Sequence, residues 1–437
     1  MSSSTTQKSA KTTERRVKIS KHREKQDISA PTKFRNVPSK SSKREVAASA
    51  DTLADTSLNS SRESSLPSSF KIIVGSYERL LYGLHGTVSV SSSASSDLEW
   101  SLKPMFIFPA HVSYIKSVAA SPQGGKWLAT GSQDEIIKIW NLRRRKEVGG
   151  LMQHEGSITH LTFPSRSHLI SASEDGTLCV FRARDWVLLR SLKGHKGRVN
   201  SVSVHPSGKV VLSVGKDRTL YMWDLMRGRR AASMKLGFEG ELVRWSTTGS
   251  LLIVQNQKSI YVYSTELTIL YTLEHTSRIH DVKFVQRVSG SGEVLLVAAE
   301  SKTTTVYEVA SDADIILRPI AHLVGHRNRV KAIDTIRIAL PSTLQDSTTI
   351  LSTVSSDGTV NVYDLSLLPP PIPKEATDIP EIPPVAMYDS KGSRLTCVTL
   401  ADGEMSHQER STPERGEKRK RESDTALDEE DEWLGLE

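Results

Sequence analysis

Residues Gly194 to Asp224 read GHKGRVNSVSVHPSGKVVLSVGKDRTLYMWD, and their pattern sets the architecture of the chain. Apolar residues at strand spacing occupy 199–204, 210–214 and 220–223. The sequences Pro-Ser-Gly and Lys-Asp-Arg between them favour turns, so the stretch predicts three strands. A sheet this small has two apolar faces, which it can bury only by packing against neighbours of the same kind.

Four residues in this stretch, His195, Ser213, Asp217 and Trp223, stand at spacings that predict one buried chain of hydrogen bonds. We expect Asp217 to accept from His195, because a buried carboxylate is costly unless it is paired. The Ser213 hydroxyl would bridge to the indole N–H of Trp223, which ends the chain. The alternative is that His195 and Asp217 form a catalytic dyad. A structural role is favoured because the set recurs, whereas a catalytic set would occur once.

This four-residue set, the tetrad, recurs at regular intervals. Its other versions are His111, Thr130, Asp134 and Trp140; His154, Ser171, Asp175 and Phe181; and His326, Thr353, Asp357 and Tyr363. Two weaker units end at Tyr263 and Tyr307, and one of them has Phe238 where the His should be. The closing aromatics lie 41, 42, 40, 44 and 56 residues apart. This spacing is typical of WD repeats, which have a period of about 40–45 residues.

The two ends of the repeat region are incomplete and complement each other. Gly75-Ser76-Tyr77-Glu78 lines up with Gly131-Ser132-Gln133-Asp134, and Leu84 takes the place of Trp140, so the chain enters a blade at its second strand. Leu395 to Leu400 (LTCVTL) has the pattern of the missing first strand. We therefore predict an all-β fold, a seven-bladed WD40 β-propeller over residues 70–403. Closure by strands from both ends would remove exposed sheet edges.

Three stretches interrupt the repeat. Residues 87–103 include TVSVSSSASSD and are predicted to form a loop insertion, and a second insertion lies near Leu340 to Ser347. Residues 369–384 are proline-rich and are expected to run extended across the outside before the closing strand. We interpret them as a spacer, with an SH3-type ligand as the alternative.

The two tails are predicted to be disordered. Residues 1–69 are rich in Ser, Thr, Lys and Arg and hold too few apolar side chains to offset the entropy of ordering. The first 50 residues carry 13 Lys or Arg against 4 Asp or Glu, whereas residues 404–437 carry 6 against 12. Lys418, Arg419, Lys420 and Arg421 resemble a nuclear localisation signal. The basic clusters suggest nuclear import or contact with RNA, and a solvated tail is the alternative.

Composition narrows the class of protein. The formal net charge is +8 over 437 residues. The two cysteines, Cys179 and Cys397, have no metal-ligand spacing and suggest a reducing, intracellular setting. No apolar run is long enough for a membrane span, and the N-terminus has no apolar core of a secretory signal. We expect no membrane partner, no small-molecule substrate, no metal and no cofactor.

Residues in the exposed loops are the candidates for binding. The loops after each opening His should share one face, and the candidates there are Tyr114, Lys196, Arg198, Lys216, Arg278, Arg327 and Arg329. They predict a basic arc with one aromatic, and arginine suits phosphate or carboxylate through forked, charge-assisted bonds. On the opposite face, Arg143 to Lys146 and Arg227 to Arg230 are candidate phosphate contacts. Ordinary surface charge is the alternative for both groups.

An enzyme is disfavoured. The sequence has no P-loop, no G-x-S-x-G, no H-E-x-x-H and no cysteine pair. The His, Ser and Asp of a tetrad look like a catalytic triad only until the repeat is seen, although the fold itself does not exclude catalysis.

Particular strings resemble a known family. VGSYERLLYGL near the start, GSQDEIIKIWNLRRRKEVGGLMQHEGSITHLTF, and GHKGRVNSVSVHPSGKVVLSVGKDRTLYMWDLMRG followed by GELVRW are similar to the PAK-interacting-protein-like WD-repeat family, whose fungal members are called maintenance-of-killer proteins. The similarity covers roughly residues 70–310 well and 320–403 more loosely. The basic N-terminal arm and the 87–103 insertion depart from it.

The resemblance implies a function. It implies a nucleolar factor in assembly of the large (60S) ribosomal subunit and in pre-rRNA processing, with pre-ribosomal proteins as partners and no inherited catalytic residue. The basic tails would add contact with ribosomal RNA. Animal members are also described as negative regulators of PAK kinases, so a kinase-binding adaptor is the second hypothesis. A substrate receptor for a ubiquitin ligase is a third hypothesis, and no residue in the sequence distinguishes it.

Overall fold

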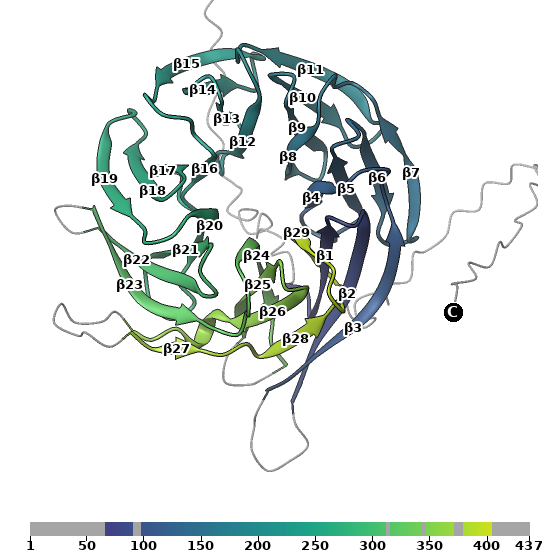
Figure 1. Ribbon diagram of the computed structural model, residues 1–437, viewed down its shortest axis with the longest axis vertical. Coiled ribbons are helices and arrows are strands. Elements are labelled where there is room, and N and C mark those ends of the chain that lie inside the picture. Colours follow the sequence, from purple (N-terminus) through teal and green to yellow (C-terminus); the bar gives the residue numbers. More distant parts are fainter. Residues whose placement is uncertain (1–65, 91–97, 312–314, 342–345, 371–378, 404–437) are drawn as a thin grey trace, which may run out of the picture. The chain divides into compact units, whose positions relative to one another are not determined.

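The structure is a computed structural model that describes residues 66–90, 98–311, 315–341, 346–370 and 379–403. Nearly all of the predicted tails, including the candidate localisation signal Lys418 to Arg421, therefore lies outside the described residues. The described residues form seven sheets arranged in a ring, antiparallel apart from one added parallel strand (Figure 1). The predicted seven-bladed β-propeller is confirmed.

The blades are numbered from the first complete repeat, and the strands of each blade are given in order from the centre of the ring outward. Blade 1 contains β4 (Ile115–Ala120), β5 (Trp127–Ser132), β6 (Ile137–Asn141) and β7 (Lys146–Leu151). Blade 2 contains β8 (Ile158–Ser165), β9 (His168–Ser173), β10 (Thr177–Arg182) and β11 (Val187–Lys193). Blade 3 contains β12 (Val199–Val204), β13 (Val210–Gly215), β14 (Thr219–Asp224) and β15 (Arg229–Lys235).

The remaining blades keep this order with additions. Blade 4 contains β16 (Leu242–Trp245), β17 (Leu251–Asn256), β18 (Ser259–Ser264) and β19 (Ile269–Glu274). Blade 5 contains β20 (Ile279–Gln286), β21 (Glu293–Ala299), β22 (Thr304–Ser311), β23 (Ile315–Leu323) and the added β27 (Glu381–Ile382). Blade 6 contains β24 (Val330–Ala339), β25 (Ser347–Ser355), β26 (Thr359–Asp364) and β28 (Ala386–Asp389). Blade 7 contains β29 (Leu395–Asp402), β1 (Ser69–Ser76), β2 (Leu80–Val90) and β3 (Leu98–Pro109).

Blade 7 joins the two ends of the repeat region. Its inner strand β29 pairs antiparallel with β1, with Ile73 opposite Thr399 and Phe70 opposite Asp402. Leu84 stands opposite Ile72 just as Trp140 stands opposite Leu128 in blade 1, so the alignment of Leu84 with Trp140 holds. Because β29 follows and β1 precedes all other blades, this pairing seals the ring.

The expectation of a loop at residues 87–103 is wrong. Strands β2 and β3 continue into this segment as a long hairpin, in which Thr87 pairs with Ser101 and Val90 with Leu98. Only residues 91–97 between them lie outside the described chain. Val88 and Trp100 are partly buried against the core between blades 6 and 7, so apolar contacts hold the extended part of the hairpin in place.

The proline-rich stretch supplies outer strands. Residues 371–378 lie outside the described chain, but residues 379–384 run along the outer edge of blade 5, where β27 pairs in parallel with β23. The chain then gives β28, the outer strand of blade 6, which pairs with β26. The extended course agrees with the spacer interpretation, and the segment also completes two sheets.

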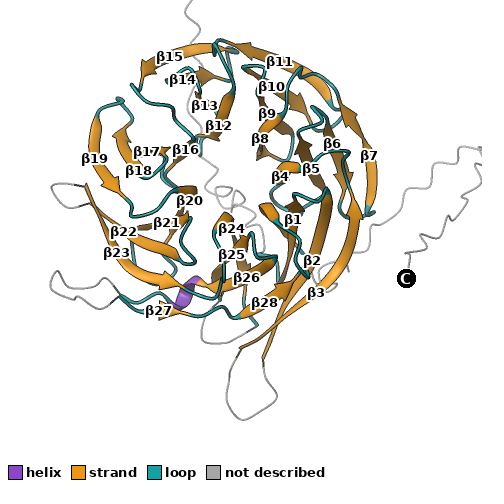
Figure 2. Cartoon of the chain, viewed as in Figure 1, coloured by secondary structure: helices purple, strands orange, loops and turns teal. Residues whose placement is uncertain are grey.

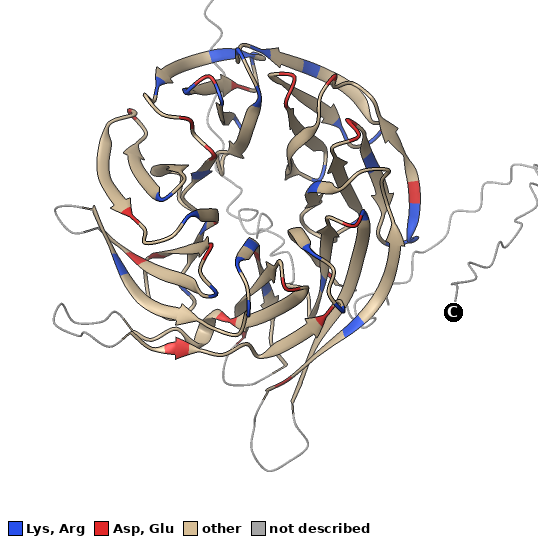
Figure 3. Cartoon of the chain, in the orientation of Figure 1, with Lys and Arg blue, Asp and Glu red and all other residues tan. Residues whose placement is uncertain are grey.

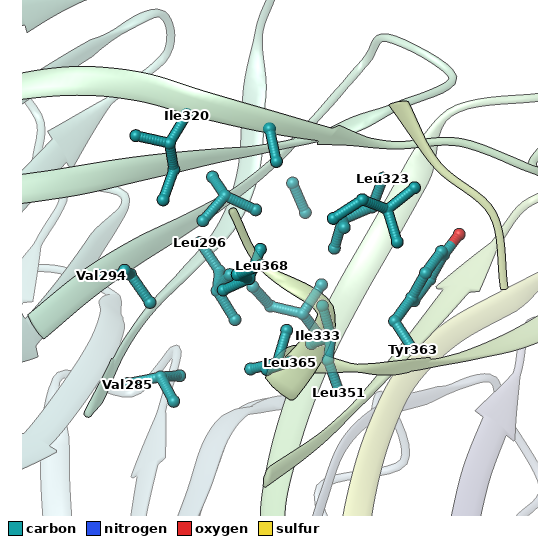
Figure 4. Close-up of a cluster of buried hydrophobic side chains, with 14 of the residues drawn as sticks. Val285, Val294, Leu296, Ile320, Leu323, Ile333, Leu351, Tyr363, Leu365 and Leu368 are labelled. Carbon is teal, nitrogen blue, oxygen red and sulfur yellow. The ribbon is translucent and has the colours of Figure 1, made fainter. Parts of the chain in front are cut away.

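Apolar side chains between neighbouring blades form the core. In the cluster of Figure 4, Leu296 and Val294 of blade 5 pack against Leu351 and Tyr363 of blade 6, each at most 1% exposed. Leu365, in the short helix η1 (Leu365–Leu367), covers the same cluster. Burying one such side chain contributes about 1.5–3 kcal/mol. A blade alone would lose these contacts on both faces.

Polar side chains link the inner strands around the ring. In five of the junctions, an oxygen of one inner strand accepts a backbone N–H from the next. The pairs are Thr399 with Ala120 (3.2 Å), Ser117 with Leu161 (2.9 Å), Ser203 with Trp245 (3.1 Å), Asp281 with Ile333 (3.1 Å) and Asp334 with Leu400 (2.7 Å). These bonds satisfy backbone donors that face the channel and fix the relative height of adjacent blades.

The described residues are almost entirely strand and loop, with η1 as their one helix (Figure 2). None of these residues builds a helix with the length and apolar character that crossing a bilayer requires.

Candidate functional site

The antiparallel order of each blade defines two faces of the ring. The His–Asp face carries the loops that hold the opening His of each repeat and the turns that hold its Asp. The opposite face carries the loops between first and second strands and between third and fourth strands. A side chain's place in the repeat therefore decides which face it occupies.

The tetrads form the expected chains in blades 1 and 3. In blade 3, His195 Nδ1 lies 2.9 Å from Asp217 Oδ1 and His195 Nε2 lies 2.8 Å from Ser213 Oγ. Trp223 Nε1 donates to Ser213 Oγ at 2.8 Å. Because the indole can only donate, the Ser213 hydroxyl donates to Nε2, and Nδ1–H donates to the carboxylate.

Blade 1 repeats this geometry. His111 lies 2.9 Å from Asp134 and 2.8 Å from Thr130, and Trp140 donates to Thr130 at 3.0 Å. Burial lowers the pKa of both His111 and His195, which favours the neutral ring. Both nitrogens of each ring are engaged inside the fold, so these groups act as structural pins between loop, strand and turn.

The other two tetrads differ in detail. In blade 2 the chain ends at Ser171, 2.7 Å from His154 Nε2, because Phe181 has no donor. Burial opposes charge on His154, but its bond to Asp175 and the nearby Cys179 raise its pKa to about 9. The raised pKa favours the charged ring at His154, in contrast to His111 and His195.

The expected chain in blade 6 is wrong in two bonds. His326 Nδ1 bonds to Thr359 Oγ1 at 2.8 Å and lies 3.7 Å from Asp357, beyond hydrogen-bond distance. Tyr363 donates to the carbonyl of Val324 at 2.8 Å. The phenol oxygen also accepts from Asn361 Nδ2 at 3.3 Å, so this aromatic residue is held by backbone and by a neighbouring amide.

The weaker units replace the tetrad by other contacts. In blade 4, Phe238 stacks on Tyr261 with ring centroids 4.4 Å apart. In blade 5, His275 Nδ1 accepts the backbone N–H of Ser277 in its own loop at 3.2 Å. An apolar stack and a local turn thus hold the loops that the His–Asp pair holds elsewhere.

The arginines of the predicted basic arc lie on the His–Asp face, each beside a carboxylate from a neighbouring blade. Arg198 lies 3.0 Å from Glu239, Arg278 2.7 Å from Glu241, and Arg329 3.6 Å from Glu300. The arginine side chains remain about half exposed, at 48%, 51% and 48%. Three of the six cations of the arc therefore lie in exposed ion pairs between neighbouring blades.

The remaining arc residues have separate environments. The backbone N–H groups of Lys196 and Arg327 donate to Asp217 and Asp357, and both side chains are exposed. Lys216 lines a hollow of about 450 Å³ between blades 3 and 4, together with Phe238.

The junction of blades 7 and 1 gathers aromatic and apolar groups on the His–Asp face. Tyr114 stacks on Tyr77 with centroids 5.1 Å apart, and the Arg394 guanidinium lies 4.3 Å from the Tyr77 centroid. Arg394 also pairs with Glu78 at 3.3 Å. Tyr77 is 49% exposed, and Val112, two residues before Tyr114, is 81% exposed. We call Tyr77, Tyr114, Val112 and Arg394 the seam patch.

Only Tyr114 of the seam patch was predicted from sequence. Tyr77 occupies the turn that aligns with Gln133, so its position was available from the repeat. Arg394 comes from the other end of the chain, and its approach to Tyr77 depends on ring closure. Aromatic residues and arginine in one exposed group are typical of protein-binding hot spots.

The central channel is lined by the inner strands and encloses about 730 Å³. Arg244 pairs with Asp281 at 3.2 Å, and its Nη1 lies 3.4 Å from His160 Nε2. Lys283 pairs with Asp334. Burial, helped by Arg244, lowers the pKa of His160 to about 3, so this ring is neutral. The charged residues of the channel were not predicted. The alternation of side chains along an inner strand does not tell from sequence whether one set of them faces a packed core or an open channel.

No cluster in the described residues suits a metal. The described part of the chain has no group of three or more His, Cys, Asp or Glu arranged to hold an ion. Cys179 and Cys397 are free and buried, and burial raises the pKa of the Cys397 thiol to about 12. A thiol with so high a pKa is a poor nucleophile.

Comparisons with known proteins agree with the geometry. The family model for the WD domain, G-beta repeat, matches residues 102–141, 145–182, 186–224 and 317–364. The matched stretches leave out blade 4 and most of blades 5 and 7, the three blades without a tetrad.

Relatives align over most of the chain. A Danio rerio protein named p21-activated protein kinase-interacting protein 1-like is 33% identical over 298 residues, which cover 68% of this chain and 74% of the relative. Protein MAK11 of Saccharomyces cerevisiae is 31% identical over 398 residues, covering 82% and 90%. Shk1 kinase-binding protein 15 of Schizosaccharomyces pombe is 26% identical over 300 residues, covering 67% and 77%. The chain therefore belongs to the WD-repeat family that includes the p21-activated protein kinase-interacting protein 1-like proteins and Protein MAK11.

Proposed function

We propose that this protein is a non-enzymatic scaffold in biogenesis of the large (60S) ribosomal subunit and in pre-rRNA processing, acting in the nucleus and nucleolus. Its partners would be pre-ribosomal proteins of the large subunit. The seam patch is the observation that carries the scaffold role, since it exposes two stacked tyrosines and an arginine on one face. The polar groups of the tetrad side chains, in contrast, already form hydrogen bonds to one another inside the blade.

The basic residues of the two tails and the similarity to Protein MAK11 support the proposed ribosomal role. The N-terminal 50 residues carry 13 Lys or Arg, and Lys418 to Arg421 form a basic run of the kind that directs nuclear import. The alignment with Protein MAK11 spans nearly that whole protein, which agrees with the resemblance drawn from the sequence. Basic tails would add salt-dependent contact with ribosomal RNA.

The gradient profile of the tagged full-length protein tests this proposal. We expect it to sediment with large-subunit precursors at low salt. The double variant Tyr77→Ala, Val112→Ser should shift it toward the top, because the seam patch loses its apolar contacts. The matched control is Val187→Ala on the outer strand β11, a residue also about half exposed. Wild-type protein that stays at the top at low salt would refute the ribosomal role.

A kinase-binding adaptor is the second candidate. It is favoured by the names of the relatives from Danio rerio and Schizosaccharomyces pombe, which describe kinase interaction or kinase binding. Mixing the purified chain with a PAK-type kinase tests it. Binding with reduced kinase activity would support a regulatory adaptor, whereas neither binding nor a change in activity would dismiss one.

A further inference from the structure

The opposite face of blades 1 to 3 presents a group of exposed cations. They lie in or next to the loops of that face, and Figure 3 shows Lys and Arg recurring over these blades. We call this group the basic surface; its members are Lys126, Arg143, Arg144, Arg145, Lys146, Arg166, Arg184, Lys209 and Arg229. Two further cations of these blades, Arg182 and Arg227, have acidic partners, Asp185 and Asp224. No carboxylate of the described residues lies within ion-pair distance of any member of the basic surface.

Local hydrogen bonds fix the loops that present these cations. Asn141 Oδ1 accepts the backbone N–H groups of Arg143 and Arg144, at 3.0 and 3.2 Å. In blade 3 the equivalent Asp224 accepts those of Met226 and Arg227, at 2.9 and 3.1 Å. The arginines therefore project from turns of defined shape, which lowers the cost of ordering them on a ligand.

The charge is specific to these blades. In blade 4, the corresponding loops at residues 246–250 and 265–268 contain no Lys or Arg, and Glu266 is acidic. In blade 5, Arg287 is only 7% exposed and bonds to the carbonyl of Ser289 and to Glu308. Position in the repeat alone thus does not produce the basic surface.

Both ends of the ring attach at this face. Strand β1 starts at Ser69 and β29 ends at Asp402, and the Asp402 carboxylate accepts the backbone N–H of Gly124. The carbonyl of Gly124 in turn accepts from Arg143 at 3.2 Å. The described chain thus enters the ring at Ser69 and leaves it at Asp402 on the side of the basic surface.

We propose that the basic surface binds the phosphate backbone of single-stranded RNA. Arginine presents forked donors that match phosphate oxygens, and cations without carboxylate partners keep their charge for a ligand. They spread over three adjacent blades, so an extended polyanion can reach more of them than a compact acidic ligand can. The acidic run of the chain itself, Asp428 to Glu432, has only five carboxylates, too few to neutralise both this surface and the N-terminal segment.

Recognition of this kind reads phosphate spacing and carries no base information. The choice of RNA over other polyanions rests on the proposed function, because large-subunit precursors are rich in RNA. The proposal adds a second, separate surface to the seam patch. Protein would bind at the His–Asp face and RNA at the opposite face.

Binding of purified full-length protein to a fluorescein-labelled uridine oligonucleotide tests the proposal, with anisotropy measured at several KCl concentrations. The variant Arg144→Gln, Arg145→Gln, Arg229→Gln removes three cations of the basic surface. The matched control Arg198→Gln, Arg278→Gln, Arg329→Gln removes the same charge from the His–Asp face. Circular dichroism and the melting temperature of each variant establish that it is folded.

We expect the first variant to reduce the slope of log K against log salt by about 2, since each phosphate contact on a single strand contributes about 0.7. Its affinity should fall by at least about tenfold at moderate salt. The control should keep the wild-type slope. Equal slopes for wild type and the first variant, or equal losses in both variants, would overturn the proposal. This assay uses purified components, so its failure is distinct from failure of the gradient experiment.

Discussion

The carboxylate of Asp334, on the inner strand of blade 6, accepts the backbone N–H of Leu400, on the closing strand of blade 7, at 2.7 Å. Its other oxygen pairs with Lys283 of blade 5. One side chain therefore connects three consecutive blades at the point where the chain ends meet. At the junction of blades 5 and 6 the Asp281 carboxylate accepts the backbone N–H of Ile333 in the same way, and at three other junctions the acceptor is a serine or threonine. A carboxylate has two oxygens and can therefore hold two partners at once.

Asp334→Ala should lower the free energy of unfolding by about 1–3 kcal/mol, because the Leu400 N–H and the Lys283 ammonium lose their acceptor. Urea denaturation followed by tryptophan fluorescence measures the change. Asp185→Ala, which breaks an exposed ion pair with Arg182 on the outer surface, is the control and should leave stability unchanged. Equal effects of the two substitutions would contradict a special role for the inner-strand bond.

Asp217→Ala should also cost about 1–3 kcal/mol, since His195 and two backbone donors are left without an acceptor. Trp223→Phe should cost less, because this variant loses only the terminal hydrogen bond of the tetrad. Blade 2, which has Phe181 at the same position, already lacks that bond. Chemical denaturation of both variants gives the comparison. A larger loss from Trp223→Phe would mean that ring packing, and not the hydrogen-bonded chain, holds the turn.

Neutralising the arginines of the His–Asp face should have little effect on stability. The triple variant Arg198→Gln, Arg278→Gln, Arg329→Gln breaks three ion pairs whose arginines are about half exposed, and such pairs contribute little in water. We expect a nearly unchanged melting temperature and weaker capture of pre-ribosomal proteins. A large drop in melting temperature would show that the pairs hold the blades together.

Acidification should destabilise the ring through buried histidines. Burial lowers the pKa of His160 to about 3 and, with Lys331 nearby, that of His280 to about 4. In the unfolded chain these rings titrate near pH 6.5, so below that pH the unfolded state binds more protons and stability falls with pH. His160→Gln should flatten the fall in unfolding free energy between pH 7 and pH 5.

His154 contributes to the pH dependence of stability with the opposite sign. Its pKa is raised to about 9, so it contributes stability below pH 6.5 and loses that contribution as the pH rises toward 9. An unfolding free energy that rises on acidification from pH 7 to pH 5 would contradict the buried, neutral state of His160 and His280.

Features repeated along the chain were predictable from sequence. The blade count follows from the spacing of the closing aromatics, and the bonds of His195 and His111 follow from residue types at fixed offsets. The hairpin at 87–103 was missed because its serine-rich tip has loop composition, while its pairing depends on register with β3.

Contacts between repeats were not predictable. Arg198 and Glu239 lie in the opening loops of different blades at different distances from the opening residue, so no single-repeat pattern links them. In blade 6, substitution of tyrosine for tryptophan moved the terminal bond from Thr353 to a backbone carbonyl. Such differences depend on side-chain reach and on packing between sheets, which a spacing rule does not contain.

Closure of the ring by β1 and β29 is the feature on which both faces and the seam patch depend. Amide hydrogen exchange of the full-length protein tests it most directly. If the ring is sealed, the amides of Thr399 and Ala401, which face β1, will be protected as strongly as those of inner strand β12 in blade 3. Exchange of β29 at the rate of an unstructured peptide, with β12 still protected, would show that the ring is open.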